Sequence, residues 1–122
     1  MTNKELINIA YKTIEQCFDN KNWLHTVGCA LLTKSGKVYT GVNVDGIHGS
    51  CAEIVTIGTA IANGDKEFEK IVAVYGIGKD KKILPPCGNC RQIMFEIDKN
   101  INIIIDEKTT KSIIDLLPYP CK

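Results

Sequence analysis

The stretch VGCALLTKSGKVYTGVNV, residues 27–44, contains two apolar segments that flank a polar turn. The segments 27–33 and 38–44 have the length and apolar character of strands. Between them, the tetrapeptide Lys-Ser-Gly-Lys at 34–37 is typical of a tight connection. We therefore predict an antiparallel hairpin here, and we expect it to begin a sheet.

Helical and extended patterns alternate along the rest of the chain. The spacing of apolar residues predicts helices over 3–19, 51–63, 87–98 and 111–117, and apolar runs predict buried strands at 71–78 and 101–105. We find no repeat and no linker-like stretch. The alternation favours one layered α/β domain, residues 1–122, built around a mixed sheet.

Composition excludes several classes of protein. The 122 residues include 15 Lys and Arg against 14 Asp and Glu, and a net charge of +1 argues against binding nucleic acid or an anionic membrane. No apolar run reaches the roughly 18 residues of a membrane span. The six cysteines are too few for a secreted disulfide scaffold. We expect a cytoplasmic protein with reduced thiols.

Two short motifs carry candidate chemistry. Cys51 and Glu53 flank an alanine, and the sequence Pro86-Cys87-Gly-Asn-Cys90 follows further along the chain. Both motifs lie at predicted helix starts, where free N–H groups and the positive end of the helix dipole favour thiolates. Three thiolates would fill three positions of a tetrahedral zinc site and leave the fourth position open, as in catalytic zinc sites.

Other interpretations of these cysteines stay open. A structural zinc site would need a fourth protein ligand, for which His48 and Cys121 are the available residues. Alternatively, Cys87 and Cys90 alone could form the reactive pair of a thiol oxidoreductase. The two remaining cysteines, Cys17 and Cys29, fall on apolar faces and are predicted to be core residues.

Glu53 has two competing interpretations. Its carboxylate, in the first helical turn, could move protons between a zinc-activated water and a substrate. Ser50 and Glu53 also have the spacing of a capping box, in which the glutamate would only cap its own helix. The downstream Pro-Cys-x-x-Cys motif favours the proton-transfer role.

The chain resembles the cytidine deaminase family of zinc-dependent nucleoside deaminases. The resemblance rests on three stretches, in order VGCALLTKSGKVYTGVN, CAEIVTIGTAIANGDKEF and PPCGNCRQIMFEI, and is strongest to the blasticidin S deaminase branch. It implies a three-layer fold whose mixed sheet is of a five-stranded type, with an N-terminal hairpin and helices on both faces.

The resemblance also implies a reaction and the residues that perform it. Cys51, Cys87 and Cys90 would hold one Zn²⁺ per subunit, and Glu53 would be the catalytic proton shuttle. The implied reaction is hydrolysis at C4 of a cytosine nucleoside, which yields the uracil product and ammonia. Cytidine or deoxycytidine would indicate pyrimidine salvage, and blasticidin S would indicate antibiotic resistance. Another aminated base is a further alternative.

Several substrate contacts follow from the same resemblance. The backbone N–H of Ala52 would bind the base O2, and the carbonyl of Pro85 would accept from the leaving amine. Asn43 would bind the sugar, with Asp45 where the family has a glutamate. His25 stands where the family has an aromatic residue, so its ring would either stack on the base or face solvent.

Two further features are implied less directly. Arg91 is the only arginine in the chain and follows Cys90, so it is the candidate for partial neutralisation of the thiolates. Its alternative role is an ordinary solvated helix residue. Relatives of this size imply a homotetramer whose sites borrow residues from neighbouring subunits, and Tyr119 is a weak candidate for such a residue. We predict a small nucleoside as the partner and neither nucleic acid nor membrane.

Overall fold

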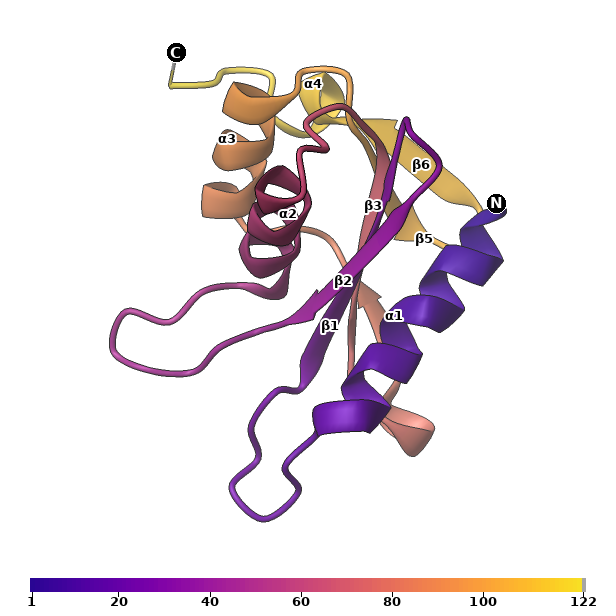
Figure 1. The fold of residues 1–122 in the computed structure, drawn as a ribbon, viewed down its shortest axis with the longest axis vertical. Coiled ribbons are helices and arrows are strands. Elements are labelled where there is room, and N and C mark those ends of the chain that lie inside the picture. Colours follow the sequence, from indigo (N-terminus) through magenta and orange to yellow (C-terminus); the bar gives the residue numbers. More distant parts are fainter. Residues whose placement is uncertain (122) are drawn as a thin grey trace.

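The elements of the chain appear in an order that mixes helices and strands. The computed structural model describes residues 1–121 (Figure 1). The helices are α1 (Asn3–Cys17), α2 (Ala52–Ala62), the 3-10 turn η1 (Gly78–Asp80), α3 (Gly88–Ile97) and α4 (Ile113–Leu116). The strands are β1 (Val27–Thr33), β2 (Val38–Val42), β3 (Phe68–Tyr75), β4 (Lys82–Leu84), β5 (Asn102–Asp106) and β6 (Thr109–Ser112).

The strands form one mixed sheet in the order β2-β1-β3-β5-β6, with β4 paired to the end of β3. β1 pairs antiparallel with both β2 and β3, and β3 pairs in parallel with β5. The predicted hairpin at 27–44 is therefore confirmed, although its second strand ends at Val42. Since β1 has a partner on each side and six of its seven residues are buried, it lies in the centre of the sheet.

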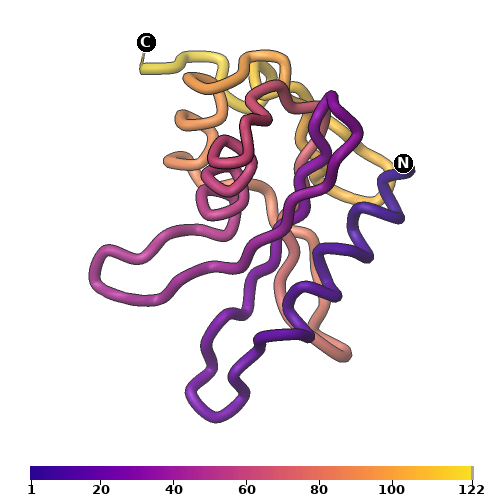
Figure 2. Tube along the Cα trace, in the orientation of Figure 1, coloured from indigo at the N-terminus to yellow at the C-terminus, as the bar shows by residue number. Residues whose placement is uncertain are grey.

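Helices cover both faces of the sheet, which gives three layers (Figures 1 and 2). The alternation of side chains along β1 separates the two cores. Ala30 and Leu32 pack with α1, whereas Cys29 and Leu31 pack with α2 and α3. The predicted layered α/β fold is thereby confirmed.

Glycine allows the closest approach between α1 and the sheet. A Cβ atom on Gly28 would lie 2.5 Å from the carbonyl oxygen of Ala10 and 2.7 Å from Cγ1 of Ile14. Both distances are shorter than any van der Waals contact, so only glycine lets the helix lie this close to β1.

Three details differ from the sequence predictions. The sheet has six strands rather than the five that the resemblance implied, and β4 and β6 are the two strands that the sequence patterns did not predict. The predicted helix over 111–117 is instead β6 followed by the four-residue helix α4, since the polar residues at 109–112 pair with β5. Cys29 is buried as predicted, but Cys17 is exposed at the end of α1, where its thiol contacts the carbonyl of Thr13.

None of the helices in the described part of the chain is long and apolar enough to cross a membrane.

Candidate active site

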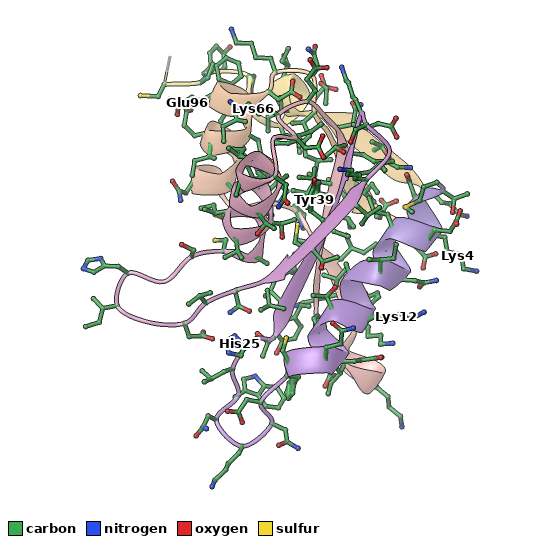
Figure 3. The ribbon with its side chains drawn as sticks, viewed as in Figure 1. Lys4, Lys12, His25, Tyr39, Lys66 and Glu96 are labelled. Carbon is green, nitrogen blue, oxygen red and sulfur yellow. The ribbon has the colours of Figure 1, made fainter. Side chains whose placement is uncertain are left out.

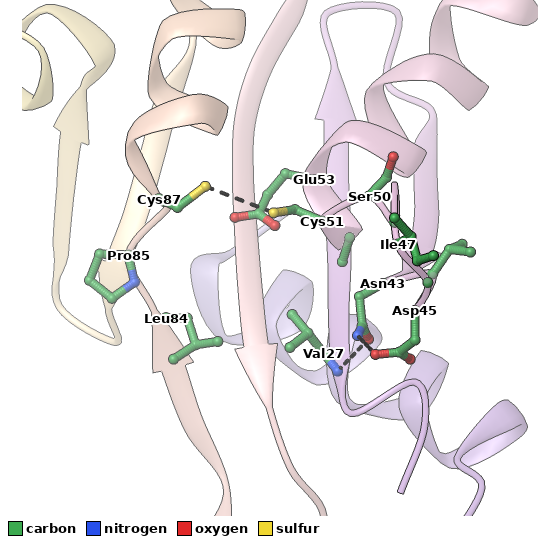
Figure 4. Close-up of a pocket in the computed structure, with 14 residues that line it drawn as sticks. Val27, Asn43, Asp45, Ile47, Ser50, Cys51, Glu53, Leu84, Pro85 and Cys87 are labelled. Atoms are coloured by element: carbon green, nitrogen blue, oxygen red, sulfur yellow. Dashed lines mark hydrogen bonds between the residues drawn. The ribbon is translucent and has the colours of Figure 1, made fainter. Parts of the chain in front are cut away.

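A cavity of about 450 Å³ opens where α2 begins. It is lined by residues 43–47, 49–53 and 84–85, together with Val27 and Cys87 (Figure 4). The cavity therefore lies between the loop after β2, the first turn of α2 and the segment that leads from β4 to α3. Its walls combine apolar side chains with a few polar groups, as is typical of small-molecule sites.

Three cysteines from separate segments meet beside this cavity. The sulfur atoms of Cys51, Cys87 and Cys90 all lie within 4.8 Å of one another, and those of Cys51 and Cys87 are 3.8 Å apart. Tetrahedral zinc with Zn–S bonds of about 2.3 Å would place its sulfurs about 3.8 Å apart. The donor set therefore fits Zn²⁺ in both chemistry and spacing.

The predicted fourth ligands lie elsewhere. Within residues 1–121, the metal-compatible cluster contains the three cysteines and neither His48 nor Cys121. His48 is exposed in the loop after β2, and the backbone N–H of Cys121 donates to the Gln92 side chain. The described residues thus bring together three sulfur atoms that could hold a metal ion, beside the cavity.

Helix starts position these sulfurs. Cys51 is the N-cap residue of α2 and Cys87 is the N-cap residue of α3, and neither helix has a side-chain cap. The free N–H groups of both first turns are therefore directed towards the cluster, where they favour negative charge.

The three thiols differ in acidity. Burial opposes ionisation of Cys87, but hydrogen bonds from the backbone of Cys90 and Asn89 and from the adjacent thiols outweigh it and lower the Cys87 pKa. Burial raises the pKa values of Cys51 and Cys90, and the charge of Glu53 adds to both shifts. Cys87 is therefore the first of the three to become a thiolate.

Glu53 reaches the same cavity from the first turn of α2. The residue is only 6% exposed, and burial raises the pKa of its carboxyl despite an opposing hydrogen bond from its own backbone. The capping-box interpretation is wrong, because the N-cap is Cys51 rather than Ser50 and no side-chain cap bond forms. A buried carboxyl with a raised pKa that faces a cavity suits proton transfer.

A polar network holds the opposite side of the cavity. Oδ1 of Asn43 accepts from the backbone N–H of Val27 at 3.0 Å, and Nδ2 of Asn43 donates to Oδ1 of Asp45 at 3.4 Å (Figure 4). The backbone N–H of His25 donates to Oδ2 of Asp45 at 3.3 Å. Asn43 and Asp45 line the cavity, whereas His25 lies behind them and is not part of the lining.

The remaining predicted site residues are distributed around the cluster. Ala52 and Pro85 line the cavity. Arg91 donates from Nε to the carbonyl of Pro86 at 2.8 Å and from Nη1 to the carbonyl of Leu116 at 3.1 Å. Its guanidinium thus links the segment before α3 to α4, which differs from a freely solvated side chain.

Several lining residues were missed by the sequence analysis. Val44 and Ile47 place apolar side chains in the loop after β2, and Leu84 does so from β4. Ile47 is 97% exposed, although isoleucine is usually buried. A lone isoleucine in the otherwise polar and glycine-rich segment 45–50 was the signal that could have revealed it.

Comparisons with known proteins agree with this geometry. A family described as the cytidine and deoxycytidylate deaminase zinc-binding region matches residues 1–105. The chain is 34% identical to a blasticidin-S deaminase of Bacillus cereus over 111 residues, which covers 84% of this chain and 77% of the relative.

Solved structures show the same fold. A mutant cytidine deaminase from Mycobacterium tuberculosis superposes with a TM-score of 0.84 at 25% identity, covering 100% of this chain and 99% of that one. A cytidine deaminase from Burkholderia pseudomallei gives a TM-score of 0.80 at 31% identity, with coverage of 98% and 99%. The chain therefore belongs to the cytidine and deoxycytidylate deaminase family and is an enzyme of the deaminase type.

Proposed function

We propose that this protein is a zinc-dependent aminohydrolase that deaminates a cytosine nucleoside to the uracil product and ammonia. The observation that carries the proposal is a cluster of three cysteine sulfurs, two of which line the same cavity as one buried glutamate. Convergence of all three thiols also favours a metal site over a redox pair formed by Cys87 and Cys90 alone.

Cys51, Cys87 and Cys90 would hold the zinc ion. Zinc in such a site acidifies water and stabilises the negative charge that develops during hydrolysis. Glu53 would accept a proton from the attacking water and deliver it to N3 of the cytosine ring. It would then take the proton of the hydroxyl group newly bound to C4 and pass it to the departing amine, which leaves as ammonia while C4 becomes a carbonyl. One carboxyl would thus serve both proton transfers. Burial supports this role because it raises the pKa of the carboxyl, which makes the carboxylate a better proton acceptor.

The nucleoside would be held by groups around the cavity. The backbone N–H of Ala52, at the start of α2, would donate to the base O2. The Pro85 carbonyl would accept a hydrogen bond from the exocyclic amine. Asn43 and Asp45 would bind the sugar hydroxyls, since both line the mouth and are already oriented by hydrogen bonds.

Arg91 would lower the electrostatic cost of gathering three thiolates. Its guanidinium bonds the carbonyl of Pro86, the residue that precedes Cys87, and it lies at the first turn of α3 beside Cys90. A fixed positive charge at this place would partly offset the negative charge of the sulfurs.

Two related substrates fit the proposal. One relative is named blasticidin-S deaminase and others are named cytidine deaminase. We propose cytidine or deoxycytidine as one alternative and blasticidin S as the other, both as small-molecule substrates of a single-domain, cytoplasmic homotetramer. The exposed side chains of Ile47 and Tyr119 are compatible with contacts between subunits.

The first experiment compares ammonia release from cytidine, deoxycytidine and blasticidin S by the zinc-loaded protein. Glu53→Gln is the matched variant, since it preserves the side-chain shape and removes the transferable proton. We expect it to keep one zinc per subunit and lose roughly a thousandfold or more in turnover. Wild-type activity in this variant would exclude the mechanism. A fourth protein ligand in the zinc K-edge spectrum would instead support a structural zinc domain.

A further inference from the structure

His25 lies two residues before β1 begins (Figure 3) and does not itself line the cavity. Its ring nitrogen Nδ1 is 2.8 Å from the backbone carbonyl of Asn43, and its backbone N–H donates to Asp45 at 3.3 Å. His25 therefore contacts both Asn43 and Asp45, the two polar residues that line this side of the cavity. Its side chain fixes the backbone of Asn43, and its main chain fixes the carboxylate of Asp45.

The chemistry of the groups determines the direction of these bonds. A carbonyl oxygen carries no proton, so Nδ1 of His25 must be the donor to Asn43. Oδ1 of Asn43 is already occupied by the N–H of Val27, which leaves the Nδ2 group directed towards Asp45. The donor and acceptor of each hydrogen bond in the network are therefore fixed, and the carboxylate of Asp45 is its final acceptor.

The backbone of His25 is held in an unfavourable conformation. Its φ of 60° lies in the left-handed region, which costs about 1–2 kcal/mol for a residue with a Cβ atom. Such a conformation persists where surrounding contacts maintain it, and it is concentrated at functional sites. Here it directs the backbone N–H to Asp45 while the ring meets Asn43.

We infer that His25 is a positioning residue, which holds Asn43 and Asp45 in the arrangement that recognises a sugar hydroxyl of the substrate. The inference rests on the proposed function, in which Asn43 and Asp45 bind the sugar of the substrate. It assigns His25 to the support of that site rather than to stacking on the base. His25 thereby determines how strongly the enzyme distinguishes nucleosides with sugar hydroxyls from those without them.

The test measures kcat/KM of the zinc enzyme for cytidine and for 2′,3′-dideoxycytidine, which lacks the sugar hydroxyls concerned. His25→Gly tolerates the left-handed backbone but removes the ring. We expect this change to lower the preference for cytidine roughly 5- to 30-fold, which corresponds to one or two hydrogen bonds. The loss should appear in KM, with kcat within about twofold of wild type because Glu53 and the cysteines stay in place.

Two further variants separate the possible roles of the ring. The side-chain N–H of an asparagine can occupy the place of Nδ1, and asparagine accepts the left-handed conformation, so His25→Asn should restore most of the preference. His25→Phe can stack on a base but cannot donate, so it should behave like His25→Gly. Full preference in His25→Phe, or an unchanged preference in His25→Gly, would overturn the inference.

Trp23 provides the control. It shares the left-handed backbone, with φ of 57°, but its ring packs edge-on against Phe18 at 5.1 Å. Trp23→Gly should therefore keep the preference within about twofold, which would show that relief of backbone strain is not the cause.

An NMR measurement decides the inference without any substrate. In the zinc protein, His25→Gly should accelerate exchange of the Asn43 side-chain amide protons by roughly tenfold, because the network loses its anchor. Unchanged exchange would overturn the positioning role. If the wild type deaminates none of cytidine, deoxycytidine and blasticidin S, the proposed function fails, and this measurement still tests the role of His25.

Discussion

The two sides of the cavity are built in different ways. On one side, Cys51, Glu53 and Cys90 lie at the starts of two helices that pack against the central sheet. On the other side, the loop 43–50 extends away from the sheet (Figure 1), and the side chain of its Ile47 is 97% exposed. An antiparallel bridge between Val44 and Ser50, with two hydrogen bonds of 3.0 Å, closes this loop.

Under the proposed function, this difference would separate the residues of catalysis from those of substrate recognition. Residues on the helix side share their packing with the hydrophobic core, so changes there affect folding and catalysis together. Residues on the loop side contact few buried groups, so changes there alter substrate binding with little effect on the free energy of unfolding. Substitutions on the two sides of the cavity test this separation.

Removal of a helix-side ligand should have the largest effect. Cys87→Ala takes away the thiol with the lowest pKa of the three, and two sulfurs no longer make a stable site. We expect loss of bound zinc, measured by mass spectrometry of the purified protein, and activity below roughly a thousandth of wild type. Cys121→Ala is the control, because Cys121 lies outside the cluster and should leave one zinc per subunit. Stoichiometric zinc in Cys87→Ala would contradict the assignment.

Substitution of Gly41, which packs closely against α2, should have the next largest effect. A Cβ atom on Gly41 would lie 2.5 Å from Oγ1 of Thr56, whose hydroxyl donates to the carbonyl of Ala52. Gly41→Ala should therefore displace the first turns of α2 and lower the free energy of unfolding by about 1–3 kcal/mol, measured by urea denaturation. Activity should fall with stability, since Glu53 lies on the same turn.

Two variants show whether this effect comes from the contact itself. Gly58 lies in α2, the helix that Gly41 contacts, and no atom lies within 4 Å of the Cβ position at residue 58. Gly58→Ala should therefore be neutral or slightly stabilising. Adding Thr56→Ala to Gly41→Ala removes the overlapping oxygen and should recover part of the loss. Equal destabilisation by Gly41→Ala and Gly58→Ala would rule out the close-contact explanation.

A substitution in the loop 43–50 should mainly change the KM for the substrate. A Cβ atom on Gly49 would lie 2.2 Å from the carbonyl oxygen of Val44, so Gly49→Ala must shift the loop. Because the loop is exposed, we expect a smaller change in unfolding free energy than for Gly41→Ala. We expect KM for cytidine to rise roughly 3- to 10-fold in steady-state kinetics. A loss of kcat without a change in KM would show that the two sides are not separable.

A hydrogen bond outside the cavity should have the smallest effect. The hydroxyl of Tyr39 donates to Oδ2 of Asp65 at 2.5 Å, which ties β2 to the segment after α2 and lowers the pKa of Asp65. Tyr39→Phe keeps the ring and removes only this bond to an exposed carboxylate. The thermal midpoint should fall by less than roughly 4 °C, with kinetic constants unchanged. A change in KM would show that the contact between Tyr39 and Asp65 is coupled to the loop 43–50.

The sequence predicted the helix side better than the loop side. The starts of the two helices, which precede Glu53 and Cys90, can be identified from local signals in the sequence. The two motifs come together when the sheet forms. The strand at 109–112 was missed because an edge strand of polar residues has the composition of a loop.

The network around His25 could not be predicted for a different reason. It depends on a left-handed φ, which is uncommon outside glycine and has no reliable pattern in the sequence. Without that angle, the position of His25 suggested only stacking or exposure. The exposed Ile47 also contradicts the usual relation between apolar character and burial.

The separation of the cysteines along the chain affects the order in which the protein assembles. Cys87 and Cys90 are neighbours in sequence, whereas Cys51 precedes Cys87 by 36 residues, a segment that includes all of β3. Closing a loop of that length in an unfolded chain costs about 3–4 kcal/mol of conformational entropy. If the protein binds zinc as proposed, a nascent chain would bind the ion through the local pair first, and complete coordination would follow once the sheet has brought α2 alongside α3. An ion held by both helices would then slow unfolding.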